Sequence, residues 1–296
     1  MKKKYIILVA FAMTISLSGC YDLDRVPADQ LSSKQFYKNE EHAKEAMMAV
    51  YSQMQNDNVF GLQFSMDGLG GIAMGYDPPS YQTFQRGTYD VKNDWVLNKW
   101  KNLYEGIARA NGVLQNVDRC QMADELKVQY KAEAKFMRAL YYFTLMDFFG
   151  GVPIYDESVV VSKSYSDMKN AREPIEKVRE FVLKDLAEAI DKLPEAWDKT
   201  NYGRATKYAA IALTGKVYLY AKEYQKALDS FKQVVASGKY ALYNDYAGLF
   251  KPGGDESSEM IFAIQNMGGV GTDHGMPMNF YMGTRESYGS CWNNVM

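Results

Sequence analysis

Along most of this chain, apolar residues recur at intervals of three and four positions, which is the period of an amphipathic helix. The clearest case covers residues 96–117, where the apolar positions are Val96, Trp100, Leu103, Ile107, Ala110, Leu114 and Val117. They form one continuous stripe, so this pattern predicts a helix that contributes to the core. From its place in the stripe we expect Trp100 to be buried, with Trp95 as its more exposed neighbour.

The same period predicts helices over about 39–55, 123–149 and 174–194, and local signals mark their ends. Asn39 precedes two glutamates, which makes it a good N-cap with acidic residues in the first turn. Two glycines and a proline follow the second helix, and Pro174 opens the third at a favoured position. The chain is therefore predicted to be built mainly from helices.

Residues 206–239 fit the pattern of a tetratricopeptide helix pair. With Gly215 at the small position of the first helix, the expected spacings are met by Tyr218, Tyr224, Ala227 and Phe231. Placing Pro194 at the terminal proline of the motif assigns the preceding pair, residues 123–194, to the same repeat type. We predict an all-α fold: a tetratricopeptide-like helical repeat scaffold, an α-α superhelix, with long irregular loops.

Two stretches interrupt the helical period. Residues 57–92 are rich in glycine, proline and aromatic residues, and a loop of this length inside a compact domain is usually functional. After Tyr240 the period fades again, and only Met260–Ile264 has the pattern of a strand. We expect residues 39–296 to form one helical domain that carries these excursions.

The first residues follow a different pattern. Three lysines at 2–4 precede an apolar run, Tyr5–Leu17, and small residues then lead directly to Cys20. The run is shorter than the about 20 residues that cross a bilayer, so a cleaved signal peptide over 1–19 is the favoured interpretation. The junction resembles the lipobox of bacterial lipoproteins, which makes Cys20 a lipidated first residue, followed by a lipid-anchored tether and short helix over 20–38. The alternative is an ordinary signal peptide with a chance cysteine.

Composition narrows the function further. The formal net charge is −2, and loss of the signal lysines makes the mature chain more acidic, which argues against nucleic acid as a partner. The only histidines are His42 and His274, and no HExxH, CxxC or glycine-rich phosphate loop occurs, so no metal or cofactor is expected. Cys120 and Cys291 could form at most one disulfide, and spacing alone does not decide whether they pair.

Short stretches spread over nearly the whole chain form a specific ordered set. The first are Tyr21–Leu23 behind Cys20, then Trp100, Tyr104, Ile107, Ala110 and Asn111, then Glu133, Ala134, Phe136 and Arg138–Tyr141, then Phe149, Gly150, Val152 and Pro153. The later ones are Asp185, Leu186, Ala189 and Leu193, then Gly203–Thr206, Ala209 and Ala210, then Tyr218 and Leu219, then Tyr240, Leu242, Phe250, Ser258, Glu259, Ile261 and Phe262. Together they resemble the SusD/RagB family of nutrient-binding outer-membrane lipoproteins of Gram-negative bacteria.

The resemblance implies a non-enzymatic, surface-exposed binding protein of the outer membrane. Such a protein covers a SusC-like TonB-dependent transporter and hands it oligosaccharides or other nutrients, with helices as scaffold and transporter-facing surface and aromatic ligand residues on loops. Family members are usually much longer than 296 residues, and the chain reaches Met296 without the polar element that normally caps a repeat array. We therefore expect the chain to be truncated at its C-terminus.

Candidate ligand residues follow from sugar chemistry, which needs flat aromatic faces beside planar polar groups. Family members with a mapped glycan site place an acid, an arginine and an aromatic residue in the loop before the helix that contains Trp100. In this chain that loop holds Asp67, Tyr76, Tyr81 and Arg86. The C-terminal stretch adds Tyr281, Arg285, Tyr288 and Trp292.

Other interpretations stay open. Tyr81 and Phe84 could simply pack the loop onto the helices, and Glu133, Arg138 and Arg204 read as structural ion-pair or capping partners rather than catalysts. A protein-interaction scaffold without its own ligand site is the main alternative, because tetratricopeptide stacks commonly bind peptides. A surface glycosidase is less favoured, since it requires two carboxylates in a cleft and no acidic residue lies in a motif that singles it out.

Overall fold

The computed structural model describes residues 36–61, 83–84, 86–159, 171–251 and 253–265. The chain divides into a short unit, residues 1–37, and a main unit, residues 38–296. Only residues 36 and 37 of the short unit are described, and their aromatic rings meet edge to face with centroids 5.3 Å apart. All that follows concerns the main unit.

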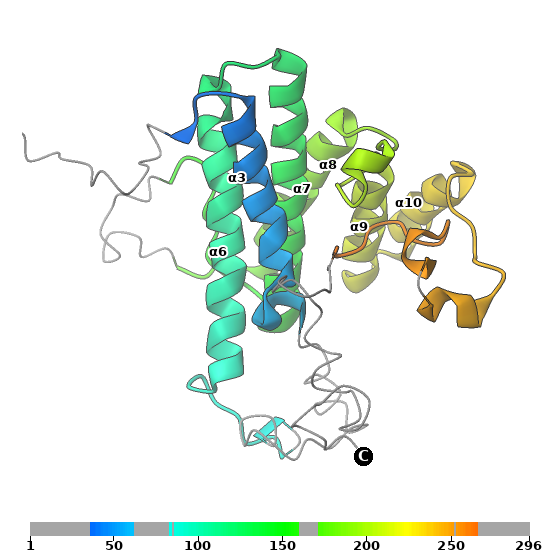
Figure 1. Ribbon diagram of the computed structural model, residues 1–296. Coiled ribbons are helices and arrows are strands. Elements are labelled where there is room, and N and C mark those ends of the chain that lie inside the picture. The colour runs from blue at the N-terminus through cyan, green and yellow to red at the C-terminus, as the bar shows by residue number, and fades with distance from the viewer. Residues whose placement is uncertain (1–35, 62–82, 85, 160–170, 252, 266–296) are drawn as a thin grey trace, which may run out of the picture. The chain divides into compact units, whose positions relative to one another are not determined.

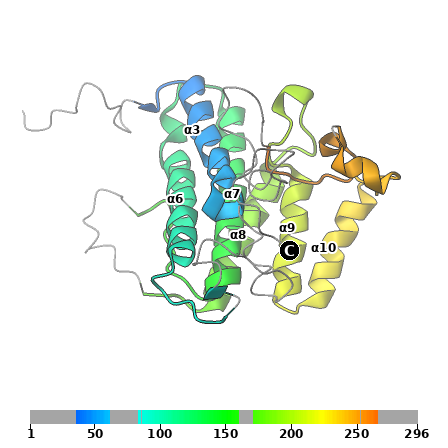
Figure 2. The ribbon, with the colours of Figure 1, turned by 60° about the horizontal axis from the view of Figure 1, so that its bottom comes forward.

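The main unit is a succession of antiparallel helices in chain order (Figures 1 and 2). Its longer helices are α3 (Glu40–Ser52), α6 (Asp94–Asn116), α7 (Asp124–Phe149), α8 (Ile175–Lys192), α9 (Lys207–Tyr220) and α10 (Tyr224–Ala236). Short turns are η1 (Gln53–Gln55), η2 (Asp57–Gly61), η3 (Val117–Arg119), η5 (Lys199–Asn201), η6 (Tyr246–Phe250) and η7 (Gly254–Glu256). α7 lies between α6 and α8, α3 covers α6 and α7, and α9 packs between α8 and α10. The all-α prediction is confirmed.

Local chemistry explains where these helices begin and end. The Asn39 side chain accepts a hydrogen bond from the His42 amide at 3.0 Å, and Thr206 accepts one from the Ala209 amide at 3.1 Å, so both act as N-caps. α7 ends at Gly150, whose φ of +71° is a conformation that glycine adopts without strain. The predicted helix ends therefore lie where the capping signals placed them.

Two glycines allow close contact between neighbouring helices. A Cβ atom on Gly106 of α6 would lie 2.7 Å from the Tyr141 ring of α7, and one on Gly215 of α9 would lie 2.6 Å from the Phe231 ring of α10. Real Cβ atoms do not approach rings so closely. The prediction that Gly215 is the small position of the repeat is confirmed, and α9 and α10 approach each other at that point.

The prediction for the two tryptophans of α6 is wrong. Trp95 is only 6% exposed, with its ring 5.5 Å from Phe84 and 5.9 Å from Phe148, whereas Trp100 is half-buried. At this end of α6 the buried positions are 95, 99 and 103, so the apolar stripe is turned by one residue and Lys99 occupies a core position. Because Lys99 is polar, the spacing of the apolar residues did not reveal this shift.

The predicted strand at Met260–Ile264 is also wrong. Within the ranges that the structure describes there is no β-strand, and these residues form an irregular segment with no neighbouring strand to complete a ladder. The Phe262 ring instead packs edge to face on Phe136 of α7, with centroids 5.0 Å apart. We call residues 260–265 the 260s segment.

The length and hydrophobicity of the helices decide whether any of them could cross a membrane. Of those that are described, none is both long enough and apolar enough to cross a membrane.

Candidate functional site

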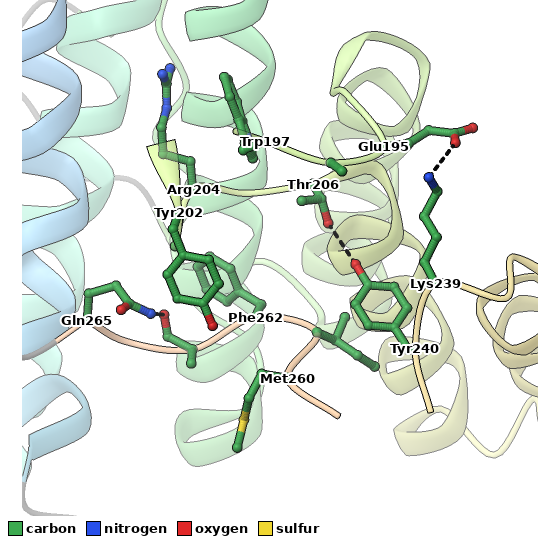
Figure 3. Close-up of a pocket in the computed structure, with 14 residues that line it drawn as sticks. Glu195, Trp197, Tyr202, Arg204, Thr206, Lys239, Tyr240, Met260, Phe262 and Gln265 are labelled. Atoms are coloured by element: carbon green, nitrogen blue, oxygen red, sulfur yellow. Dashed lines mark hydrogen bonds and ion pairs between the residues drawn. The ribbon is translucent and has the colours of Figure 1, made fainter. Parts of the chain in front are cut away.

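A pocket of about 370 Å³ opens where the loop between α8 and α9, the residues after α10 and the 260s segment meet (Figure 3). We call it the Tyr202 pocket. Its aromatic lining residues are Trp197, Tyr202, Tyr240 and Phe262. Its polar lining residues include Glu195, Arg204, Thr206, Lys239 and Gln265. Aromatic faces beside a few polar groups are the chemistry of a small-molecule site.

A second hollow of about 230 Å³ lies between the end of α3, the loop before α9 and the 260s segment. It shares with the Tyr202 pocket five residues, Tyr202, Gly203, Arg204, Ala263 and Gln265. Gly203 has φ +88°, and a Cβ atom there would overlap the Gln265 side chain. Glycine is therefore required in the shared wall, both for its backbone conformation and for the contact with Gln265.

A buried ion pair holds the arginine of the pocket wall. Arg204 Nε donates to Glu133 Oε2 at 2.9 Å, and the guanidinium lies over the Trp197 ring at 3.9 Å and over the Tyr130 ring at 5.3 Å. Glu133 is fully buried, and this burial raises the pKa of its carboxyl, while hydrogen bonds from Arg204 and Tyr51 act in the opposite direction. The interpretation of Glu133 and Arg204 as structural ion-pair partners is confirmed.

Hydrogen bonds tie the backbone of the pocket wall to the same pair. The Tyr51 hydroxyl donates to Glu133 Oε2 at 2.7 Å and accepts from the Ala205 amide at 2.9 Å. Trp197 Nε1 donates to the Ala205 carbonyl at 2.7 Å. The wall is thus fixed from α3, from α7 and from within the loop, so its shape is set before any ligand arrives.

The outer edge of the pocket has a more exposed ion pair. Lys239 Nζ lies 3.3 Å from Glu195 Oε2, with the two side chains 38% and 52% exposed. Nearby, the hydroxyls of Thr206 and Tyr240 lie 3.5 Å apart. Since Arg204 is paired with Glu133 and Lys239 with Glu195, each of the two cations that line the pocket has an acidic partner.

A second buried cluster surrounds Arg138 of α7. Its guanidinium makes two hydrogen bonds to Asp185 of α8, at 2.7 and 2.8 Å, and further bonds to Asn111 of α6 and to Glu157. Arg138 and Asp185 are 2% and 3% exposed. The cluster joins three helices and the stretch after α7, so the structural interpretation of Arg138 is confirmed as well.

Lys99 is a buried cation that the sequence did not single out. Its Nζ donates to the Val59 carbonyl at 2.5 Å and lies 4.5 Å from the Phe148 ring centre and 5.1 Å from that of Trp95. Burial lowers the pKa of Lys99 to about 8, and Asp147 acts in the opposite direction. The lysine attaches η2, at the start of the 57–92 loop, to α6.

Of the predicted ligand residues, one lies in the described part of the chain. Arg86 is described, and it is exposed, next to the turn at Gly87. The predicted residues that lie outside the described ranges are Cys20, Asp67, Tyr76, Tyr81, Tyr281, Arg285, Tyr288 and Trp292. None of the predicted ligand residues is among the described residues that line the Tyr202 pocket, and the pocket stands as an additional candidate site.

Sequence reasoning missed the pocket because its members come from three separate segments. Trp197 and Tyr202 stand in a short loop after Pro194. Two aromatic residues so close together in a short loop were the signal that the sequence offered. In the described ranges no group of three metal-type ligands occurs, and the buried thiol of Cys120 forms no disulfide there.

Comparison with known proteins gives one family. Residues 23–219 match the SusD-like family that is described as starch-binding and associating with the outer membrane. A SusD-like protein of Formosa agariphila, P25, is 26% identical over 89% of this chain and 52% of its own length. The starch-binding protein SusD of Bacteroides thetaiotaomicron is 25% identical over 71% of this chain and 37% of its own length. The chain thus spans about half the length of the curated relatives it matches.

Solved structures agree with this assignment. A laminarin-binding SusD-like protein superposes with a TM-score of 0.69 at 28% identity, covering 76% of this chain and 51% of that one. A SusD-like protein of Bacteroides fragilis superposes with a TM-score of 0.71 at 24% identity, covering 82% of this chain and 48% of that one, and shows the same fold. Because the family match covers well over half of the residues, this chain belongs to the SusD-like family.

Proposed function

We propose that this protein is a non-catalytic, carbohydrate-binding lipoprotein on the surface of the outer membrane. The observation that carries the proposal is the family match over residues 23–219, a range that includes the helices from α3 to α9. One relative is named as starch-binding and another as laminarin-binding, so a glucan is the first ligand to test. A binding role also fits the structural use of the buried acids Glu133 and Asp185, each of which is paired with an arginine.

The glycan would contact the loop before α6 and the stretch after the 260s segment. The loop contributes Asp67, Tyr76, Tyr81 and Arg86, and the stretch contributes Tyr281, Arg285, Tyr288 and Trp292. Tyrosine and tryptophan rings stack on the apolar face of a sugar ring, while carboxylate and guanidinium groups bind its hydroxyls. Lys99 supports this arrangement because it attaches the beginning of the loop to α6.

Cys20 would carry the lipid that holds the protein at the membrane. Acyl chains contribute about 0.8 kcal/mol for each buried CH₂ group, and several chains give stable anchoring. The experiment is metabolic labelling with a radioactive fatty acid. We expect label in the wild-type chain and none in Cys20→Ala, and label retained by Cys20→Ala would contradict the anchor.

Delivery to a TonB-dependent transporter is the second part of the proposal. One observation also favours a protein-binding role for the helices. α10 buries Ala227, Ser230 and Val234 toward α9, yet Tyr224 and Val235 on its other side are 64% and 77% exposed. An apolar outer face on the last helix of a repeat pair is the kind of surface that another element or a partner covers.

The glycan proposal is tested by calorimetric titration of the full chain, extracted in mild detergent, with laminarihexaose and maltohexaose. We expect saturable binding, weakened at least tenfold in Tyr76→Ala and Trp292→Ala. Loss of one stacked aromatic ring removes both its buried area and its contact with the sugar.

Tyr246→Ala is the matched control, because Tyr246 is 76% exposed and is neither a predicted ligand residue nor a described lining residue of the pocket. Its affinity should equal that of the wild type. A chain that binds neither glucan but binds a peptide would overturn the glycan proposal and favour the protein-interaction scaffold. Equal losses in the control and in the loop variants would remove the predicted ligand residues from the site.

A further inference from the structure

We propose that the Tyr202 pocket is a separate subsite that binds one ring of a neutral saccharide. The proposal rests on the carbohydrate-binding function above, and it adds a site whose described lining residues differ from the predicted loop residues. It is argued from the aromatic surface, the charges, the size and the rigidity of the pocket.

The aromatic surface is accessible and comes from three segments. The Tyr202 side chain from the loop before α9 is 45% exposed, Tyr240 follows α10, and Phe262 belongs to the 260s segment (Figure 3). One face of Trp197 is occupied by the Arg204 guanidinium at 3.9 Å. Tyr202 is the one exposed ring of the four and the other three are half-buried, so it is the ring most accessible to the apolar face of a ligand.

The charges of the pocket favour a neutral ligand. Arg204 is neutralised by the buried Glu133, and Lys239 by Glu195. An acidic ligand would have to compete with the buried Glu133 for Arg204, and a basic ligand with Arg204 for Glu133, whereas the exposed Lys239–Glu195 pair costs little to rearrange. A neutral saccharide avoids both costs, whereas a peptide with charged ends or side chains does not.

Hydroxyl groups are available for hydrogen bonds to a sugar. The Thr206 and Tyr240 hydroxyls lie 3.5 Å apart, a long and weak contact that a sugar hydroxyl can bridge or replace. Each is both a donor and an acceptor, as the hydroxyls of a sugar are. The Gln265 carboxamide adds a planar polar group on the opposite wall (Figure 3).

The size limits the ligand to a small unit. A volume of about 370 Å³ stands at the lower end of the roughly 300–1,000 Å³ that small-molecule pockets occupy. A monosaccharide unit or a disaccharide fits this volume, and a long chain would extend out of the pocket.

The pocket is also held in shape before a ligand binds. Tyr51, Glu133 and Arg204 fix one wall by buried hydrogen bonds, and Gly203 allows its close contact with Gln265. A site that needs no ordering on binding loses less conformational entropy, which favours affinity for a small ligand.

Tryptophan fluorescence of the full chain carrying Trp292→Phe, in detergent, reports on the pocket, because Trp197 lines it and the other two tryptophans, Trp95 and Trp100, lie on α6. The ligands are laminaribiose and maltose, with a uronic-acid disaccharide as the charged comparison. We expect a saturable change with a neutral disaccharide, at least tenfold weaker binding in Tyr202→Ala, near wild-type binding in Tyr202→Phe, and little response to the uronic acid.

Two further variants separate this subsite from the loop site. Tyr246→Ala, at a 76% exposed tyrosine that is not among the described lining residues, should bind like the wild type, and disaccharide binding should persist in Tyr76→Ala. If hexasaccharides bind through the loops while Tyr202→Ala leaves disaccharide and hexasaccharide affinities unchanged, the subsite is refuted and the carbohydrate-binding function stands. If no saccharide binds the wild-type chain, both proposals fall.

Discussion

Two ion pairs in this molecule have the same chemistry but very different surroundings. Arg138 and Asp185, between α7 and α8, are 2% and 3% exposed and share two hydrogen bonds. Lys239 and Glu195, at the edge of the Tyr202 pocket, are 38% and 52% exposed. Lys239 Nζ and Glu195 Oε2 lie 3.3 Å apart. The side chains of the second pair are open to solvent, and those of the first are almost fully buried.

This difference divides the chain into a fixed part and an adjustable part. A buried charge without its partner is strongly destabilising, so the α7–α8 pair leaves little freedom in how these helices pack. An exposed pair contributes about 0–1 kcal/mol and can be rearranged at little cost. Binding at the edge of the pocket is therefore compatible with a rigid helical scaffold behind it.

The largest expected effect comes from breaking the buried pair. Arg138→Met removes the guanidinium and leaves the Asp185 carboxylate buried without its partner, which we expect to lower the free energy of unfolding by about 3–5 kcal/mol. Denaturant unfolding followed by circular dichroism measures the change.

The double variant Arg138→Met/Asp185→Leu is the control for this experiment. It removes both charges, and replacing a buried pair by apolar residues of similar size is often neutral, so stability should recover in large part. A single variant as stable as the wild type would show that the cluster does not hold α7 and α8 together.

An intermediate effect is expected at Lys99, a buried cation that forms no ion pair with a carboxylate of the described residues. Its pKa is lowered to about 8 by burial, while the unfolded chain has the ordinary value near 10.5. Between these values the unfolded state binds more protons, so stability should rise as the pH increases from about 8 to 10.5, by at most about 3 kcal/mol. Urea unfolding at several pH values up to 10 measures this slope.

Lys99→Met should remove most of this pH dependence. Lys216→Met is the matched control, because Lys216 is an exposed lysine that also acts on Asp147, and the slope should remain. An unchanged slope in Lys99→Met would mean that another group titrates, and that the lysine is not held as a buried charge.

The smallest effect is expected at the exposed pair. Lys239→Ala removes one partner of Glu195, and we expect the free energy of unfolding to change by less than about 1 kcal/mol. Thermal unfolding at low and at high salt measures it. A loss comparable to that of Arg138→Met would contradict the division into fixed and adjustable parts.

Much of the fold could be predicted because helix signals are local. The stripe of α6, the Asn39 N-cap and the Gly150 end of α7 depend only on residues a few positions apart. Prediction from the sequence was less accurate for elements that form only when a second segment of the chain packs beside them. Met260–Ile264 is a short apolar run that suggests a strand, but a strand requires a neighbouring strand, and among the described residues its ring contact is with a helix.

The candidate sites depended on different kinds of information. Glu133 and Arg138 were assigned correctly as structural from their places beside apolar helix positions, and Arg204 from its place just before the start of a helix. The ligand residues of the loops stay predictions, since among them only Arg86 is described. The Tyr202 pocket was not predictable from spacing, because Trp197, Tyr240 and Phe262 belong to three different segments of the chain.

By itself, the sequence determined the helices, their caps, the repeat type and the family, because each depends on the order and spacing of neighbouring residues. Only the tertiary structure decided which side chains meet across those elements. It buried Lys99 in place of an apolar residue, exchanged the expected roles of Trp95 and Trp100, and brought Tyr202, Tyr240 and Phe262 around one pocket. The physical reason is that such contacts depend on how helices rotate and pack against one another, which local periodicity does not specify.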